Sequence, residues 1–335
     1  MTRVAVVGGG AWGTTLADLL ARKGEAVTLW AREADVVAGI NRDHVNAVFL
    51  PGAPLAPALT ATTEIAAAVG GAEVLVCAAP SHAMRQVMTS AVGGGRGVRR
   101  ATLVSVAKGL EPERLNTMSC VLADVCGPGA PVAVLSGPTF AREVYDRHPT
   151  AVVTAAREHD VALRVQELFS TARFRVYTHT DVIGVELGGA LKNVIAVAAG
   201  ILEGLGLGDN TRAALITRGL AEITRLGVAL GADPLTFAGL AGMGDLVLTA
   251  TGAQSRNHAL GVALGAGKSL AEAQAGKATV AEGVNTARTA VALAARHGVD
   301  LPIAREVAAI LFEGKAPRLA VADLMERELK REQWR

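Results

Sequence analysis

The feature that most constrains the fold of this chain is a glycine-rich segment near its start, residues 8–13 (GGGAWG). It follows the apolar run RVAVV and precedes a helical pattern, which gives G-x-G-x-x-G between a strand and a helix. In that setting Gly8 permits a tight turn, Gly10 lets a pyrophosphate approach the backbone, and Gly13 lets helix and strand pack closely. The free N–H groups of the helix start then face the phosphates. The segment predicts a dinucleotide-binding fold, with a merely structural glycine turn as the alternative.

Apolar, β-branched runs alternate with helical patterns through the first half, which is typical of a parallel, doubly wound sheet. After Asp181 the strand-like runs fade and helical patterns take over. We therefore predict an α/β Rossmann-like doubly wound sheet over residues 1–180, followed by an all-helical second domain over residues 181–335. The predicted strands are 3–7, 26–30, 73–79, 101–107, 132–135, 151–155 and 174–177. The predicted later helices include one running to about Leu230 from a cap at Asn210 or Thr211, and others at 286–297, 303–312 and 321–330.

Composition narrows the classes of partner. Lys plus Arg number 33 and Asp plus Glu 31, so the net charge of +2 gives no electrostatic footprint for nucleic acid. The three cysteines lack metal-ligand spacing and are expected to be reduced thiols, with no metal site. No leader pattern precedes the first strand, and Lys192 interrupts the longest apolar run below spanning length. We expect a cytoplasmic protein with no membrane span, whose oligomeric state is open and for which a homodimer is possible.

The end of the second predicted strand bears on the choice of dinucleotide. An acidic residue there usually bonds the ribose 2′-OH of NAD. Here the segment reads Trp30-Ala31-Arg32-Glu33, and an arginine at position 32 suits a 2′-phosphate instead. Glu33 beside it keeps NAD open, and the alternative for Arg32 is a solvated residue that starts the next helix. The expected cofactor is NADP(H), NAD(H) or both.

Residues 185–200 (VELGGALKNVIAVAAG) form a helical pattern that is apolar nearly all round, as in a helix buried on every side. Lys192 lies in its middle, and a buried ammonium is costly unless it is paired or functional. Gly189 and Gly188 precede it by three and four residues, so the lysine leans over a patch without β-carbons, where a ligand could approach. The alternative is a snorkelling lysine with a packed stem.

Polar residues follow several predicted strands, where doubly wound sheets bind their ligands. Lys108 and the turn Gly137–Thr139 both fall at such ends. His82 does too, but a lone histidine after a strand more often caps a helix or faces water.

The segment Gln254–Asn257 (QSRN) gathers four hydrogen-bonding side chains at a predicted helix start. Helix N-termini and arginine both favour phosphate, which makes Arg256 a candidate anchor. The alternative is an ordinary N-cap beside an exposed arginine. Asp245, after a glycine pair in GLAGMGDLVL, is a further candidate, and Glu282 is a weaker one because it could simply open the following helix.

Several motifs, taken in order, resemble bacterial-type NAD(P)-dependent sn-glycerol-3-phosphate dehydrogenase over residues 1 to about 315. They are GGGAWGTTLA at 8–17, AKGLE at 107–111, SGPTFARE at 136–143, ELGGALKNVIAVAAG at 186–200, LITRGLAEI at 215–223, GMGDLVLT at 242–249 and QSRN at 254–257. The resemblance implies hydride transfer between NAD(P)(H) and the pair sn-glycerol 3-phosphate and dihydroxyacetone phosphate. It also implies a supply of glycerol 3-phosphate for phospholipid synthesis.

The resemblance further implies roles for single residues. Lys192 would be the catalytic proton acceptor and would contact the substrate. The other substrate-binding residues would be Lys108, Gly137, Thr139, Asp245, Ser255, Arg256 and Asn257. Besides the glycines at 8, 10 and 13, the cofactor would contact Ala11, Trp12, Arg32, Lys108, Ala141, Arg256, Val280 and Glu282.

As a general base, Lys192 needs a pKa lowered from ~10.4 toward roughly 7–8, and burial and the charge of Lys108 would push it that way. Lys108 or Asn193 could polarise the substrate carbonyl. One rival is a 3-hydroxyacid dehydrogenase of similar build, where the lysine and asparagine lie a turn apart rather than adjacent as here. The other is a non-catalytic dinucleotide-binding sensor, which would need only the first domain, so Asp245 and Arg256 argue against it.

Overall fold

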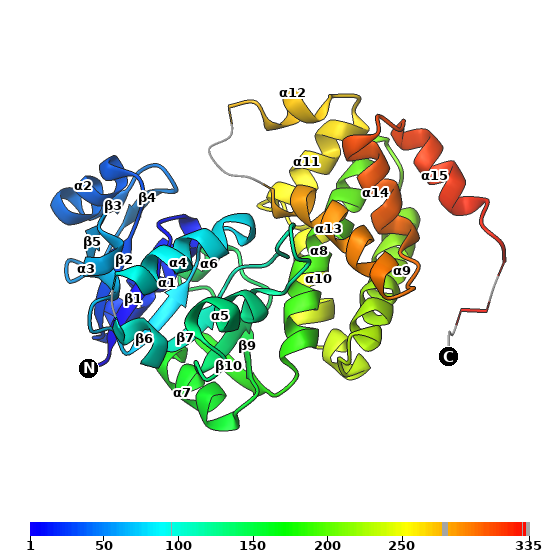
Figure 1. The fold of residues 1–335 in the computed structure, drawn as a ribbon. Coiled ribbons are helices and arrows are strands. Elements are labelled where there is room, and N and C mark those ends of the chain that lie inside the picture. Colours follow the sequence, from blue (N-terminus) through cyan, green and yellow to red (C-terminus); the bar gives the residue numbers. More distant parts are fainter. Residues whose placement is uncertain (95, 277–280, 330, 333–335) are drawn as a thin grey trace.

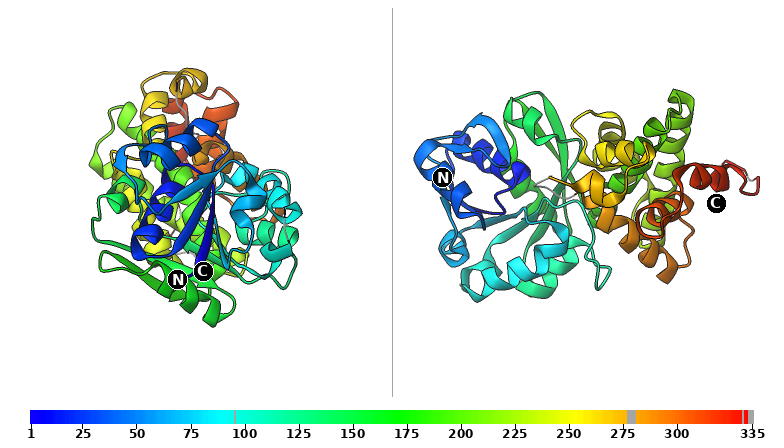
Figure 2. Two further views of the ribbon diagram at one scale, coloured as in Figure 1. Left: turned by 90° about the vertical axis from the view of Figure 1, so that its left-hand side faces the viewer. Right: turned by 90° about the horizontal axis from the view of Figure 1, so that it is seen from above.

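A computed structural model describes residues 1–94, 96–276, 281–329 and 331–332. In Figure 1 the first half of the chain forms a sheet flanked by helices, and the second half forms a group of helices beside it. The right-hand view of Figure 2 shows the same division from above. The sheet half ends with strand β10 at His179, and the helical half begins with helix α8 at Val182.

The first half is built on an eight-stranded sheet in the order β10-β9-β8-β7-β6-β1-β2-β5. All neighbours from β5 to β8 are parallel, as predicted. The strands are β1 (Arg3–Val7), β2 (Ala26–Trp30), β5 (Thr60–Thr62), β6 (Val74–Cys77), β7 (Thr102–Ser105), β8 (Val132–Ser136), β9 (Thr150–Ala156) and β10 (Phe174–His179). A separate antiparallel pair, β3 (Val45–Asn46) and β4 (Leu50–Pro54), lies outside this sheet.

The last two strands correct the prediction of a fully parallel sheet. β9 pairs antiparallel with β8, from Ser136 against Val153 to Ala133 against Ala156, and β10 runs parallel to β9. Parallel neighbours need a crossover of a dozen or more residues over one face, whereas antiparallel neighbours do not. The segment between β8 and β9 holds only the five-residue helix α6 (Ala141–Tyr145), and the chain returns to the sheet in the opposite direction.

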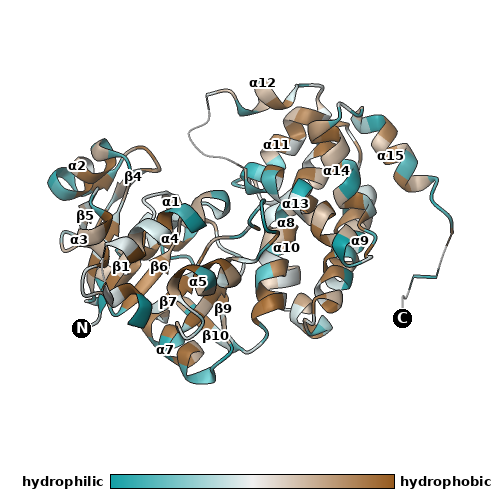
Figure 3. Cartoon of the chain, viewed as in Figure 1, coloured by the Kyte–Doolittle hydropathy of each residue, from teal (hydrophilic) through white to brown (hydrophobic). Residues whose placement is uncertain are grey.

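Successive residues of β1 show why the sheet is covered on both faces. Val4 and Val6 pack into a core with α1 (Ala11–Lys23) and α7 (His159–Phe169). Their neighbours Ala5 and Val7 pack into a second core with α4 (Met84–Gly93) and α5 (Met118–Cys126). Side chains alternate across a strand, so an unbroken apolar run needs helices on both sides. Figure 3 shows the strands coloured mostly as hydrophobic.

Helix α8 (Val182–Gly204) is the core of the second half, and every residue from Leu187 to Leu202 is buried. By length and composition α8 could cross a membrane, but 83% of its most apolar window is buried inside the protein. The helices packed against it are α9 (Asp209–Ala229), α10 (Asp245–Thr251), α11 (Arg256–Gly265), α13 (Glu282–Arg296) and α14 (Pro302–Phe312). The remaining helices and short turns are α2 (Ala34–Asp43), α3 (Ile65–Val69), α12 (Leu270–Gln274), α15 (Pro317–Met325), η1 (Ser81–Ala83), η2 (Arg96–Arg100), η3 (Pro234–Ala238) and η4 (Leu240–Gly244).

Three of the predicted helices differ at their ends. α13 begins at Glu282, four residues before the predicted start at 286. α9 begins at Asp209 after Gly208, which makes no side-chain cap, so the predicted cap at Asn210 or Thr211 is wrong. The last helix lies at 317–325 rather than 321–330. Pro317 occupies its first turn, where the missing N–H has no partner in any case, and the proline therefore starts the helix.

Candidate active site

Lys192 is the buried cation at the middle of α8, and only 5% of the residue is exposed. Its Nζ donates to Asp245 Oδ1 at 2.5 Å and to Thr249 Oγ1 at 2.6 Å. Asp245 opens α10 directly after η4, a π-helical turn, and Thr249 lies one turn further along the same face. The lysine is thus paired inside the protein and does not snorkel to the surface.

Lys108 reaches the same carboxylate from the sheet half. It follows β7, and its Nζ donates to Asp245 Oδ2 at 2.7 Å, to the Gly137 carbonyl at 2.7 Å and to Thr139 Oγ1 at 3.0 Å. Asp245 therefore bridges two lysines, one oxygen to each. The structure brings together five sequence candidates at this point, at the carboxyl ends of β7 and β8: Lys108, Gly137, Thr139, Lys192 and Asp245.

The pKa of Lys192 is lowered to about 7. Burial is the main cause, because water no longer solvates the ammonium. The negative charge of Asp245 opposes this shift, and the positive charge of Lys108 adds to it. The direction is the one expected from the apolar helix and the second cation.

The sequence predicts that a ligand could approach Gly188 and Gly189, but the structure shows protein atoms against both glycines. A β-carbon at Gly188 would lie 2.6 Å from the Ala241 carbonyl oxygen, and one at Gly189 would lie 2.6 Å from Ser136 Oγ. The missing β-carbons let η4 and the end of β8 press against α8, so protein atoms occupy that patch. This close approach holds Asp245 and the Gly137 turn within reach of the two lysines.

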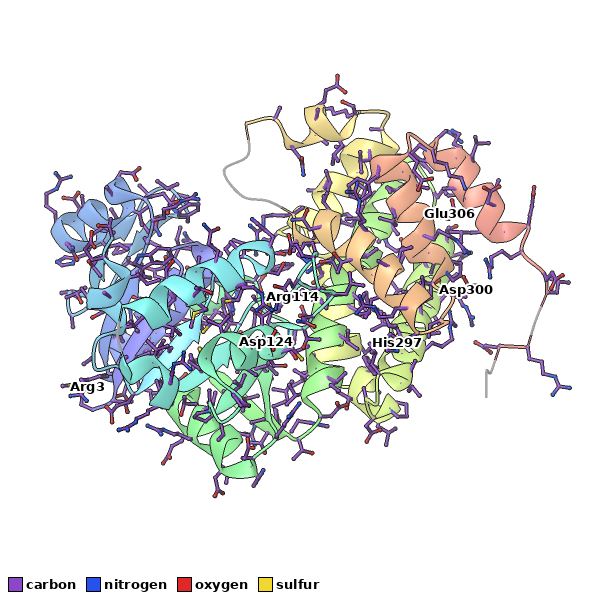
Figure 4. All side chains as sticks on the ribbon, in the orientation of Figure 1. Arg3, Arg114, Asp124, His297, Asp300 and Glu306 are labelled. Atoms are coloured by element: carbon purple, nitrogen blue, oxygen red, sulfur yellow. The ribbon has the colours of Figure 1, made fainter. Side chains whose placement is uncertain are left out.

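The loop after Lys108 is anchored in the helical half. Leu110 is 1% exposed and belongs to the apolar core of the helical half. The Lys108 carbonyl accepts a bond from Asn193 Nδ2 at 3.0 Å, and the Arg114 carbonyl accepts one from Arg296 Nη1 at 3.5 Å. Figure 4 shows Arg114 where the two halves meet. The helical half therefore helps to fix the backbone of a residue that the sheet half supplies.

Asn193 and Asn257 join α8 to α11 and α13. Asn257 Nδ2 donates to Asn193 Oδ1 at 2.9 Å, and Asn257 Oδ1 accepts from the Gly283 N–H at 3.0 Å. Since Asn193 also donates to the Lys108 carbonyl, both amides take part in a chain of bonds across three helices. This geometry favours a positioning role for Asn193 over the polarisation of a substrate carbonyl.

Ser255 and Arg256 start α11 and differ in what they contact. Ser255 Oγ caps the helix by accepting from the His258 N–H at 3.1 Å. Arg256 has no hydrogen bond or ion pair among the described residues, and part of its side chain reaches solvent. Neighbouring protein atoms exclude water from part of its guanidinium and lower its pKa, and the negative charge of Glu282 opposes that shift. Arg256 thus presents a charged fork at a helix N-terminus, which is the chemistry that a phosphate requires.

The glycine-rich loop has one open face. Gly8 has a φ of +131°, and a β-carbon there would lie 2.7 Å from the Ala78 carbonyl group. One at Gly13 would overlap the Gly8 carbonyl. Gly10, in contrast, has no described heavy atom within 4 Å of that position, and it caps α1 without a side-chain bond. The open backbone beside free N–H groups fits a dinucleotide pyrophosphate.

The remaining cofactor candidates are spread around this loop. The side chain of Arg32 is 85% exposed just after β2, and its Nη2 lies 3.0 Å from Glu33 Oε1. Trp12 has a buried Nε1 without a described partner, and Ala141, at the start of α6, accepts a bond from Thr15 Oγ1 at 3.3 Å. Glu282 opens α13 and accepts from Ser81 N at 3.3 Å and Ser81 Oγ at 2.5 Å, whereas Val280 lies outside the described residues.

Sequence reasoning missed Thr249 and Ser81. The spacing of Asp245 and Thr249 by one helical turn could have indicated Thr249. No local signal indicates Ser81, because its partner Glu282 is 201 positions away. His82, which the sequence disfavoured as a catalytic residue, lies exposed in η1. Among the residues that the structure describes, no group of three or more His, Cys, Asp or Glu could hold a metal ion.

Comparisons with known proteins match both halves. The model of the NAD-dependent glycerol-3-phosphate dehydrogenase N-terminus matches residues 3–162, and that of the C-terminus matches residues 181–322. The chain belongs to this family. The resemblance seen in the sequence motifs is therefore confirmed, and neither rival is favoured.

Relatives of this glycerol-3-phosphate dehydrogenase family member match along its whole length. A protein of Geobacter sulfurreducens named glycerol-3-phosphate dehydrogenase, NAD(P)+, is 56% identical over 335 residues, 99% of each chain. One of Anaeromyxobacter with the same name is 52% identical over 98% of this chain and 99% of its own. A crystal structure of glycerol-3-phosphate dehydrogenase from Coxiella burnetii has a TM-score of 0.92 at 40% identity, covering 97% of this chain and 99% of the other.

Proposed function

We propose that this protein interconverts sn-glycerol 3-phosphate and dihydroxyacetone phosphate as an NAD(P)-dependent dehydrogenase. The observation that carries the proposal is Lys192, a buried lysine with a pKa of about 7, held by a carboxylate that also binds Lys108. A general base works best when its pKa lies near the working pH. The names of the relatives and the matching family models support the substrate pair.

Lys192 can move a proton because of how its nitrogen is bonded. Asp245 and Thr249 take two of the positions around Nζ, and the third has no partner among the described residues. In the neutral amine that position is a lone pair, which accepts the hydroxyl proton at C2 during oxidation. In the ammonium it is an N–H, which returns the proton to the carbonyl oxygen during reduction. When bound, the nicotinamide supplies the accompanying hydride chemistry at C2.

The substrate phosphate is proposed to bind at the start of α11. Arg256 would pair with it through the guanidinium fork, and the free N–H groups of the first turn would add further donors. Ser255 and Asn257 would hold this turn in place. Ser255 caps α11, and Asn257 donates to Asn193. Binding of the remote phosphate would orient C2 against Lys192.

The cofactor is proposed to lie on the open face of Gly10, with Ala11 and Trp12 at the start of α1. Arg32 is exposed at the end of β2, where a 2′-phosphate would meet it, so NADPH is the favoured form. Glu33 beside it leaves NADH usable. Ala141 and Glu282 would contact the cofactor from α6 and α13, and the functional boundary between cofactor and substrate domains would fall between residues 180 and 181.

Three further features belong to this proposal. The enzyme would act in the cytoplasm, would supply glycerol 3-phosphate for phospholipid synthesis, and would form a homodimer. The three cysteines without metal-ligand spacing support the first feature. The second rests on glycerol 3-phosphate, the compound in the relatives' names, as the product of the proposed reduction. No contact of this chain bears on the homodimer.

The deciding experiment is a spectrophotometric assay of dihydroxyacetone phosphate reduction with NADPH and, separately, with NADH. Turnover with at least one cofactor is expected, together with strict dependence on the ketone substrate. An enzyme pure and folded by circular dichroism that turns over neither cofactor would contradict the proposed function.

A further inference from the structure

Helices α8 and α11 touch along a seam of four glycines. Gly200 and Gly204 lie on α8, and Gly261 and Gly265 lie on α11, each pair one helical turn apart. A β-carbon at any of the four would overlap a backbone carbonyl of the other helix: His258 for Gly200, Val262 for Gly204, Val197 for Gly261 and Ile201 for Gly265. At Gly261 the same β-carbon would also lie 2.8 Å from the Ile201 nitrogen. The two backbones are therefore in direct contact on both sides.

The seam continues the hydrogen bond near the catalytic lysine. Asn257 of α11 bonds Asn193 of α8, and one turn later Gly261 meets Val197. After another turn Gly265 meets Ile201, so both helices advance together in the same direction. The helices are parallel, and the N-terminal turn of α11 is held beside the turn of α8 that carries Lys192.

We propose that the glycine seam of Gly200, Gly204, Gly261 and Gly265 is a positioning device, which sets the distance from Lys192 to the phosphate-binding turn at Arg256. This rests on the proposed function, because it assigns the seam to the reaction of that same site. A small substrate spans both ends of the site, and a misplacement of about 1 Å between the reacting group and its anchor can cost about 10²-fold in rate. Helices in backbone contact leave little freedom for such a shift.

The contact partners show why an added methyl group at the seam must move a helix. The atoms opposite all four glycines are backbone atoms, which cannot turn away as a side chain can. Gly219 of α9 provides the contrast, because a β-carbon there would meet only the side chain of Ile195 on α8, with Cγ2 at 2.6 Å. Ile195 lies about 200° around α8 from Val197, so a methyl group at Gly219 disturbs the face of α8 that points away from α11.

The test compares Gly261→Ala, one turn from the phosphate-binding turn, with Gly265→Ala, one turn further away, and with Gly219→Ala as the control in α8 packing. For each variant, kcat/KM is measured with dihydroxyacetone phosphate and with unphosphorylated dihydroxyacetone, and the ratio gives the preference for phosphate. Thermal unfolding and the KM for NADPH are measured alongside.

We expect Gly261→Ala to lower the phosphate preference about tenfold or more, and Gly265→Ala to lower it clearly less, since a displacement at the far turn moves Arg256 less. Gly219→Ala should leave the preference unchanged, and all three should keep the KM for NADPH.

Equal losses of preference at 261 and 265, or lower thermal stability with an unchanged preference at both, would overturn the proposal. If Gly261→Ala does not fold, an unchanged phosphate preference in Gly265→Ala would also overturn the proposal. Wild-type protein that does not reduce dihydroxyacetone phosphate would refute the proposed function instead, and the seam proposal with it.

Discussion

Lys108 and Lys192 share one carboxylate, yet their ammonium groups differ in the number of hydrogen-bond partners and in burial. Lys108, on the loop after β7, has three oxygen partners, and these use all three of its N–H donors. Lys192, inside α8, has two partners among the described residues, and its side chain is 6% exposed against 15% for Lys108. A fully bonded cation serves as an anchor, whereas a buried amine with one position left over can exchange a proton. Residue type alone does not separate these roles.

Replacing Lys192 by Ala should give the largest effect and tests this comparison directly. We expect kcat to fall by at least ~10²-fold, the typical contribution of a general acid–base. Binding of NADPH, measured by fluorescence titration, should survive because the glycine-rich loop lies in the other half of the molecule. A variant with near-normal kcat would make Lys192 a packing residue and would remove the distinction from Lys108.

Replacing Arg256 by Ala should affect substrate binding and leave the lysine pair intact. The KM for dihydroxyacetone phosphate should rise by a factor that corresponds to roughly 1.5–3 kcal/mol, the range for a hydrogen bond to a charged group. Arg256→Lys should recover only part of this, because an ammonium cannot make the bidentate contact. Steady-state kinetics of both variants decide the matter, and an unchanged KM in Arg256→Ala would show that the start of α11 does not bind the substrate phosphate.

The pH dependence should separate the two lysines most sharply. With a pKa of about 7, Lys192 is neutral above that pH, so glycerol 3-phosphate oxidation should fall as the pH drops below about 7. Dihydroxyacetone phosphate reduction needs the ammonium and should fall above it. The carboxylate of Asp245 raises this pKa and the charge of Lys108 lowers it. Asp245→Asn should therefore move the midpoint of the kcat/KM profile to lower pH, and Lys108→Ala should move it to higher pH.

The measurement needs only residual activity in these two variants, because it compares the pH at the midpoint and not the rate. Shifts in the same direction, or none in either variant, would show that the group titrating in the profile is not Lys192.

The smallest effect is expected at Arg32, far from both lysines in the sequence. Replacing Arg32 by Asp should raise the KM for NADPH about fivefold, near the upper limit for an exposed charge contact. The KM for NADH should stay the same. The KM values for the two cofactors are the readout. An equal loss for both would show that Arg32 does not contact the 2′ position.

Local requirements of the chain were readable from the sequence. The glycine-rich loop between strand and helix predicted the sheet half, because tight turns and close backbone packing require glycine at particular positions. The apolar run around Lys192 predicted a buried helix, because burial follows from the apolar character of the helix surface. An ordinary N-cap is the alternative that the sequence offers for residues 254–257, and Ser255 does cap α11 by accepting from the backbone of its own helix.

Only the tertiary structure decided which distant groups share one point in space. Asp245 is 53 positions from Lys192 and 137 from Lys108, and no periodicity connects such separations. The sequence predicts a patch open to a ligand at Gly188, but the backbone of η4 fills it. The sequence also predicts a parallel β9, but β9 pairs antiparallel with β8. A sequence pattern records what each segment requires of its surroundings, namely an apolar neighbour, a missing β-carbon or a charge partner. Which segment meets that requirement depends on the packing of whole helices and strands, and this packing also gave one of two chemically identical lysines its free position.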